Sequence, residues 1–307
     1  MDEFLGCLIK ELQPYLNEDE IAYDVKVMVN NGVTENRIAL RKDNAPTGPT
    51  IRVDGLVQAY NKGEVTMEMA ARLVMNLFRH EESKNVHVPY VTEFTEDVAK
   101  RVRMMFVNQE KNKERLERGL VPFVRFEDCG LAGTFFVAGT TEDGEPKVRT
   151  EWAMHISYEM FKYWSCDLSA EDLFELSMKN LNAEDDTCII ATLDADVLNK
   201  KSGEVKNVPL PLEMYIVSLR SRNYGASAIL ADSVREQLRE ILQEDKVFVL
   251  PSSVHETIVV RYKPEYAEMF SQMVKDVNRE VVDEKEILSD DIFEMDLVTG
   301  KLKKYEI

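Results

Sequence analysis

The stretch with the most potential for chemistry is residues 251–256 (PSSVHE), which connects two predicted strands. Ser252, Ser253, His255 and Glu256 are therefore expected to cluster at one end of a sheet. A serine or a histidine there could serve as nucleophile or general base. Glu256 could orient the imidazole, although neighbouring residues on a strand point to opposite faces. The structural alternative is ordinary turn chemistry, in which the hydroxyls bond to local backbone.

A second polar turn, residues 220–225 (RSRNYG), stands between a predicted strand and a predicted helix. A helix N-terminus offers free N–H groups to an anion, and an arginine beside it could clamp a phosphate or carboxylate. The candidate anion-binding residues are Arg220, Arg222, Asn223, Tyr224 and Gly225. The alternative is that both arginines pair with the acidic surface. If the two turns meet in space, they form one site.

Metal and cofactor patterns are missing from the sequence. The histidines (His80, His87, His155 and His255) lack the spacing of ligands on one helix face, and the cysteines form no C-x-x-C pair. The acidic clusters at 184–186 and 194–196 could bind Mg²⁺, but solvated acidic loops are far commoner. Phosphate-binding and dinucleotide-binding glycine patterns do not occur. We expect no metal and no cofactor.

The elements around these turns predict an α+β fold. It has a mixed helix and hairpin N-terminal part and a β-rich C-terminal part with flanking helices. Asn30-Asn31-Gly32 predicts a hairpin turn. Residues 95–118 read as one helix ending before Gly119, with the charged stretch 108–118 as its solvent-exposed face. The predicted parts are 1–118 and 119–307, with a single domain as the alternative.

Charge excludes some functions. The chain has 38 basic and 56 acidic residues, a net charge of −18. Nucleic-acid binders and proteins that dock on anionic membranes rely on Lys and Arg, so neither direct nucleic-acid binding nor membrane binding is expected. A strongly negative charge favours solubility. It also fits a protein that presents carboxylates to a basic partner, and residues 276–296 are the most acidic stretch.

Location is predicted from three features. The N-terminus, Met1-Asp2-Glu3, is acidic where a signal peptide would be basic. The longest apolar stretches fall short of a membrane span. The four cysteines are widely spaced, which is typical of free thiols in a reducing compartment. We predict a cytoplasmic protein.

Several segments resemble one known family. They are residues 49–51, Asn108 with 110–112, residues 125–126, 214–230 (MYIVSLRSRNYGASAIL), 251–256, 277–278 and 288–290. The chain is similar to a domain-of-unknown-function family, number 5688, of intracellular proteins abundant in gut Clostridia. The similarity spans nearly the whole chain and is weakest over 182–212. It implies an α+β fold and a cytoplasmic location, and it implies no activity.

Two functions follow from these patterns. The first is a non-enzymatic interaction protein that binds another protein through its acidic surface. The second is a small-molecule or anion-binding enzyme that uses the turns 220–225 and 251–256. The sequence leaves the oligomeric state open.

Overall fold

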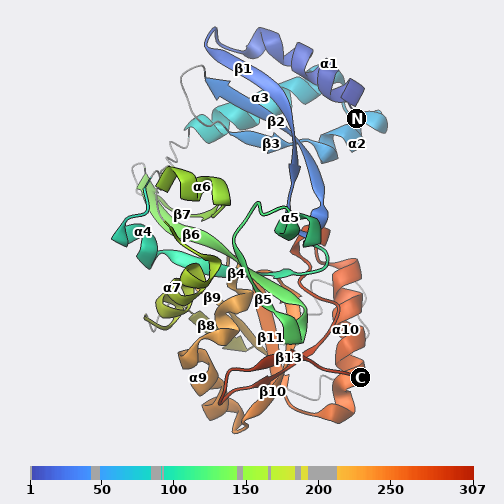
Figure 1. Cartoon of the computed structure of the whole chain (residues 1–307). Helices are drawn as coiled ribbons and strands as arrows, with labels where there is room; N and C mark the ends of the chain where they lie inside the picture. The colour runs from blue at the N-terminus through green and yellow to red at the C-terminus, as the bar shows by residue number, and fades with distance from the viewer. Residues whose placement is uncertain are drawn as a thin grey trace. The chain divides into compact units, whose positions relative to one another are not determined.

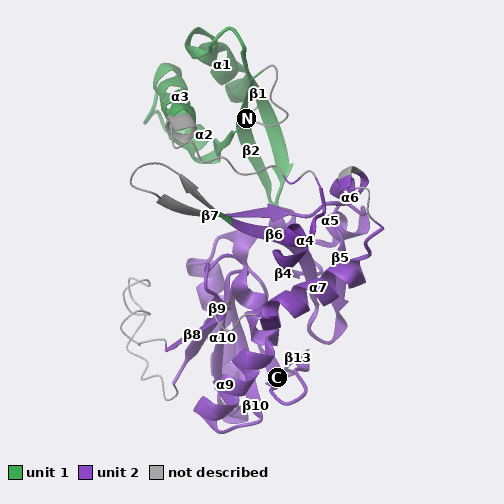
Figure 2. Cartoon of the chain, turned by 90° about the vertical axis from the view of Figure 1, so that its left-hand side faces the viewer, with its two compact units in different colours: residues 1–29, 33–89, 140–150 green, residues 30–32, 90–139, 151–307 purple. Residues whose placement is uncertain are grey.

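The computed structural model describes residues 2–42, 49–83, 91, 93–143, 148–164, 167–183, 188–192 and 213–307. The chain forms two compact units (Figure 2): unit 1 comprises residues 1–29, 33–89 and 140–150, and unit 2 comprises 30–32, 90–139 and 151–307. Residues 118 and 119, between which the sequence places a boundary, both belong to unit 2. The domain boundary between residues 118 and 119 stays a prediction.

Unit 1 consists of helices packed on a small antiparallel sheet of order β1-β2-β3 (Figure 1). Its elements are α1 (Asp2–Leu12), η1 (Gln13–Tyr15), β1 (Glu20–Met28), β2 (Thr34–Lys42), β3 (Thr50–Arg52), α2 (Asp54–Asn61) and α3 (Met67–Ser83). Thr66 caps α3 by accepting a hydrogen bond from the Met69 amide at 3.2 Å. The predicted hairpin is confirmed, since β1 and β2 pair around 30–32.

The core of unit 1 follows the helical period. Phe4, Leu5, Leu8 and Leu12 form the buried face of α1 and pack with the buried residues of α3 and the sheet. Leu8 and Leu12 are fully buried, because residues four positions apart lie on the same face of a helix.

Unit 2 contains two antiparallel sheets, ordered β4-β6-β5 with β7 also on β6, and β13-β12-β10-β11-β9-β8. Its strands, some of which extend to residues of unit 1, are β4 (Val102–Asn108), β5 (Phe123–Phe126), β6 (Leu131–Asp143), β7 (Val148–His155), β8 (Cys188–Thr192), β9 (Tyr215–Leu219), β10 (Lys246–Ser253), β11 (Glu256–Arg261), β12 (Phe293–Asp296) and β13 (Leu302–Lys304). Its helices are η2 (Asn30–Gly32), α4 (Glu96–Lys100), α5 (Lys113–Glu117), η3 (Glu127–Cys129), α6 (Tyr158–Trp164), α7 (Ala170–Ala183), η4 (Gly225–Leu230), α9 (Asp232–Leu242), η5 (Pro264–Tyr266), α10 (Ala267–Glu280) and η6 (Glu284–Glu286).

Alternation along β10 divides the core of unit 2. Val247 and Val249 face the larger cluster, which includes the β4–β6 sheet and α9, whereas Phe248 and Leu250 face α10. All four side chains are almost fully buried. The strand therefore lies between two apolar layers, which explains its uninterrupted apolar sequence.

The predicted helix 95–118 is wrong. The structure has α4, then strand β4, then α5 over this stretch. Met104, Met105, Phe106 and Val107 are all buried, and β4 pairs with β6 along its whole length. A run of four consecutive apolar residues buries both faces of a strand, whereas a helix would expose one of them.

The α+β class predicted from the sequence is confirmed, with antiparallel sheets in both units. No helix in the described part of the chain combines the length and apolar character needed to cross a membrane.

Candidate functional site

The two predicted turns meet in unit 2. The amide of Tyr224 donates to His255 Nδ1 at 3.1 Å. The amides of Gly225 and Ala226 donate to the carbonyls of His255 and Val254 at 3.0 and 3.3 Å. The contact follows from the pairing of β9 with β11, which places the end of one strand beside the start of the other.

The close contact depends on Gly225. A Cβ atom there would lie 2.3 Å from the Leu219 amide nitrogen and 2.8 Å from the His255 carbonyl oxygen. Two residues before Gly225 have positive φ angles, 55° at Arg222 and 54° at Tyr224. Residues other than glycine rarely adopt such backbone angles. Such strain is held in place by the surrounding hydrogen bonds and is common at functional sites.

His255 is held as a hydrogen-bond donor. Its ring stacks on Tyr224, with centroids 5.3 Å apart and planes 21° apart. Because Nδ1 accepts the Tyr224 amide hydrogen, the proton of the neutral ring is assigned to Nε2. Nε2 lies 3.8 Å from Glu286 Oε1, too far for a hydrogen bond and near enough for a ligand atom to contact both. The His255 side chain is 27% exposed and that of Glu286 40%.

A second histidine, His155 at the end of β7, reaches the same tyrosine. Its Nε2 lies 3.4 Å from the Tyr224 hydroxyl, and its buried Nδ1 makes no hydrogen bond with any described residue. Burial and, secondarily, Arg115 lower the pKa of His155 to about 4, so this ring is neutral near pH 7. Burial and then Glu286 raise the pKa of Tyr224, so the phenol keeps its proton.

Arg115 is one cation of this cluster, and Lys285 is a second one that lies near enough to Tyr224 to influence its pKa. Arg115 lies on α5 and is partly buried, and burial lowers its pKa. Its charge is close enough to His155 and Tyr224 to influence both pKa values. Within the described residues its guanidinium has neither a hydrogen bond nor an ion pair, whereas Arg118, the residue just after α5, pairs with Glu114 at 2.5 Å.

Asparagines hold the segments of this site together. Asn31 and Asn112 are joined by two hydrogen bonds, both 3.0 Å long. The backbone N–H of Asn31 donates to Asn112 Oδ1, and Asn112 Nδ2 donates to Asn31 Oδ1. Asn31 Nδ2 also donates to the carbonyls of Glu284 and Ile287, each at 2.7 Å. The start of α5, with Arg115, is thus tied to the turn that carries Glu286.

The other predicted residues have local partners or are exposed. The Ser252 hydroxyl donates to Glu256 at 3.2 Å, and the Ser253 hydroxyl accepts from the His255 amide at 3.1 Å. This is the turn chemistry of the structural alternative. Neither hydroxyl bonds to an imidazole in the described structure. Catalytic roles for Ser252, Ser253 and Glu256 stay predictions.

The predicted helix N-terminus is already occupied. Its helix is the short η4, and the amides of residues 224–226 all donate to the 254–255 loop, so they are not free for an anion. Arg220, Arg222 and Asn223 are exposed. Their predicted role in anion binding is untested by this geometry.

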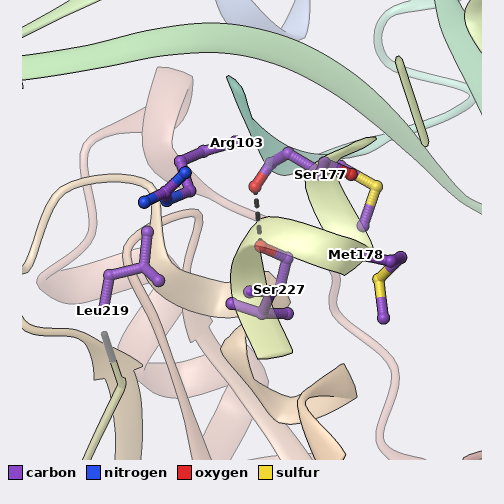
Figure 3. Close-up of a pocket in the computed structure, with 7 residues that line it drawn as sticks. Arg103, Ser177, Met178, Leu219 and Ser227 are labelled. Carbon is purple, nitrogen blue, oxygen red and sulfur yellow. Dashed lines mark hydrogen bonds between the residues drawn. The ribbon is translucent and has the colours of Figure 1, made fainter. Parts of the chain in front are cut away.

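A pocket elsewhere in unit 2 is too small for a substrate. Its lining includes Arg103, Ser177, Met178, Leu219 and Ser227 (Figure 3). Met104 also lines the pocket, and its carbonyl accepts a hydrogen bond from the Ser227 hydroxyl at 2.6 Å. A volume of about 10 Å³ has room for about one water molecule.

The acidic stretch 276–296 is partly neutralised by neighbours. Asp276 and Glu280 pair with Arg279, and Asp291 pairs with Lys304. Glu294 is buried and pairs with Lys246 and Lys303. The free negative surface is therefore smaller than the sequence suggests.

Metal ligands do not gather in the described residues, where no group of three or more His, Cys, Asp or Glu side chains could hold an ion. The acidic clusters 184–186 and 194–196 lie outside the described residues.

Comparison with known proteins identifies the family. The chain matches no curated protein and no solved structure. The model of a family of unknown function, DUF5688, matches residues 1–296. Segments that carry the resemblance lie at or beside the site, including 108–112, 214–230 and 251–256. The chain belongs to the DUF5688 family.

Proposed function

We propose that unit 2 is a small-molecule enzyme that transfers a proton on a carbonyl-containing substrate at the 220–225 and 251–256 turns. The observation that carries the proposal is the stacked pair of Tyr224 and His255 beside Glu286. An imidazole fixed as an Nε2–H donor and a protonated phenol are the groups that stabilise negative charge developing on an oxygen.

The proposed step needs only proton transfer. Glu286 takes a proton from the carbon next to the carbonyl, and the electron pair of that C–H bond moves toward the carbonyl oxygen. Hydrogen bonds from His255 Nε2 and the Tyr224 hydroxyl stabilise the resulting oxyanion. Return of the proton to carbon completes the step, and no co-reactant is required.

Hydrogen exchange tests the proposal without knowledge of the natural substrate. We expect the protein in D₂O to replace the α-hydrogens of one or more carbonyl compounds with deuterium. Proton NMR measures the loss of the α-hydrogen signals. The panel is pyruvate, methyl pyruvate, dihydroxyacetone phosphate and dihydroxyacetone. Tyr224→Phe keeps the stacked ring and removes the hydroxyl, and should slow exchange about 100-fold, as for loss of one oxyanion donor. Glu286→Gln should slow it at least as much.

Glu284→Gln is the matched control, because Glu284 lies on the same short helix η6 with an exposed side chain. It should exchange at the wild-type rate. Equal rates for wild type and Tyr224→Phe across the panel would contradict the proposal.

A second candidate function is the interaction protein predicted from the net charge of −18. It is favoured by Met69, Leu73 and Leu77, an exposed apolar stripe at i, i+4, i+8 on α3 in unit 1. For either function we propose a cytoplasmic location, supported by the free thiols of Cys7, Cys129 and Cys188.

A further inference from the structure

Arg115 has an unusual environment for a cation in an acidic protein. The chain carries 56 acidic residues, yet none of the described ones pairs with this guanidinium. The side chain is partly buried, and its neighbours His155 and Tyr224 are uncharged near pH 7. A charge withdrawn from water without a partner is costly, and a bound anion would offset that cost.

Hydrogen bonds fix the chain segment that leads into the helix carrying this arginine. Asn112, the residue before α5, is 1% exposed and is paired with Asn31 through two hydrogen bonds. Asn108 Nδ2 donates to the Leu288 carbonyl at 3.1 Å, which ties the same segment to the turn after Glu286. A freely moving surface arginine would not need this anchoring, whereas a binding residue does.

We infer that Arg115 binds an anionic group of the substrate, a phosphate or a carboxylate, next to the Tyr224 hydroxyl. The inference rests on the proposed function and narrows it to anionic carbonyl compounds. It replaces the helix N-terminus expected from the sequence, whose amides are engaged by the 254–255 loop. The guanidinium is suited to either anion because it can form two parallel hydrogen bonds.

Direct titration separates anion binding from catalysis. Inorganic phosphate and acetate are titrated by calorimetry into the whole protein, with sodium chloride at equal ionic strength as the blank. The wild type and the control Arg118→Gln, changed at the residue just after α5, should bind one of the two anions. Arg115→Gln should bind it at least tenfold more weakly, and Arg115→Lys should recover part of the loss.

Stability without added anion distinguishes a binding role from a structural one. If Arg115 supports the fold, Arg115→Gln lowers the melting temperature. If it waits for a ligand, removal of an unpaired cation leaves the melting temperature unchanged or raises it, and only the upward shift on adding the anion is lost.

The exchange assay keeps the two proposals distinguishable. Arg115→Gln should slow exchange of pyruvate or dihydroxyacetone phosphate at least tenfold more than exchange of their neutral counterparts, methyl pyruvate and dihydroxyacetone. An equal effect on charged and neutral compounds would overturn the anion inference while proton transfer stands. If no compound exchanges, the titration alone decides: wild-type binding lost in Arg115→Gln supports the inference, and equal binding by both proteins, or none, overturns it.

Discussion

Gly225→Ala should destabilise unit 2 by about 3 kcal/mol or more. The new methyl group would meet the Leu219 amide nitrogen at 2.3 Å, the Ser218 hydroxyl at 2.4 Å and the His255 carbonyl at 2.8 Å. Two of these atoms belong to the backbone, so a rotamer change cannot relieve the clash. Urea unfolding followed by tryptophan fluorescence measures the effect, because both tryptophans, Trp152 and Trp164, belong to unit 2.

Gly6→Ala is the matched control. Gly6 is exposed on α1 with open space around its Cβ position, so the substitution should stabilise that helix by up to about 1 kcal/mol. Far-UV circular dichroism follows it, since unit 1 contains no tryptophan. A Gly225→Ala protein as stable as the wild type would contradict the close contact between the turns.

Arg79→Ala should destabilise unit 1 by about 3–5 kcal/mol at neutral pH. Arg79 pairs with Glu20, whose side chain is fully buried, through contacts of 2.6 and 2.7 Å. The Arg79 hydrogen bond, aided by Asn17, lowers the pKa of Glu20 from 4.5 to about 2. Without the arginine, the buried carboxylate would lose its cation and keep only the two hydrogen bonds from Asn17.

The stability that Glu20 contributes to unit 1 depends on pH. A carboxyl with a lowered folded-state pKa adds stability that is complete above about pH 4.5 and is lost as the pH falls through about 2. At roughly 1.4 kcal/mol per pH unit, the shift corresponds to on the order of 3 kcal/mol. Urea unfolding of unit 1, followed by circular dichroism, should therefore show a smaller gap between wild type and Arg79→Ala at pH 3 than at pH 7.

Glu20→Gln with Arg79→Ala removes both charges and should be more stable than Arg79→Ala alone. A double variant that is no better would show that the arginine acts through packing or its hydrogen bond to the Tyr15 carbonyl instead.

The sequence predicts local structure well where the signal is local. The hairpin turn at residues 30–32 is such a case, since it depends on a few neighbouring residues and the pairing of β1 with β2 confirms it. The cap of α3 by Thr66 and the apolar spacing of α1 are equally local features. The polar turn at His255 is also visible, since it stands between two strongly apolar strands.

The assembly of the site is not visible in the same way. Tyr224 meets His255 because β9 and β11 pair, and strand order in an antiparallel sheet is a property of the whole fold. His155 and Arg115 come from segments much earlier in the chain, and no spacing rule connects them to either turn. Arg115 was further hidden by the incorrect helix 95–118, within which it read as one more solvated charge. The apolar run from Met104 to Val107 was the signal that could have revealed β4 and left α5 as a separate short helix.

The position of the ring proton on His255 distinguishes the proposed site from an ordinary structural histidine. Long-range proton–nitrogen NMR on protein with ¹⁵N-labelled histidine, assigned with His255→Gln, distinguishes a protonated ring nitrogen from an unprotonated one. The site described here predicts an unprotonated Nδ1 that accepts the Tyr224 amide hydrogen and a protonated Nε2 whose signal moves when a bound carbonyl compound is added. A hydrogen on Nδ1, with an Nε2 signal that no compound of the panel moves, would contradict the account.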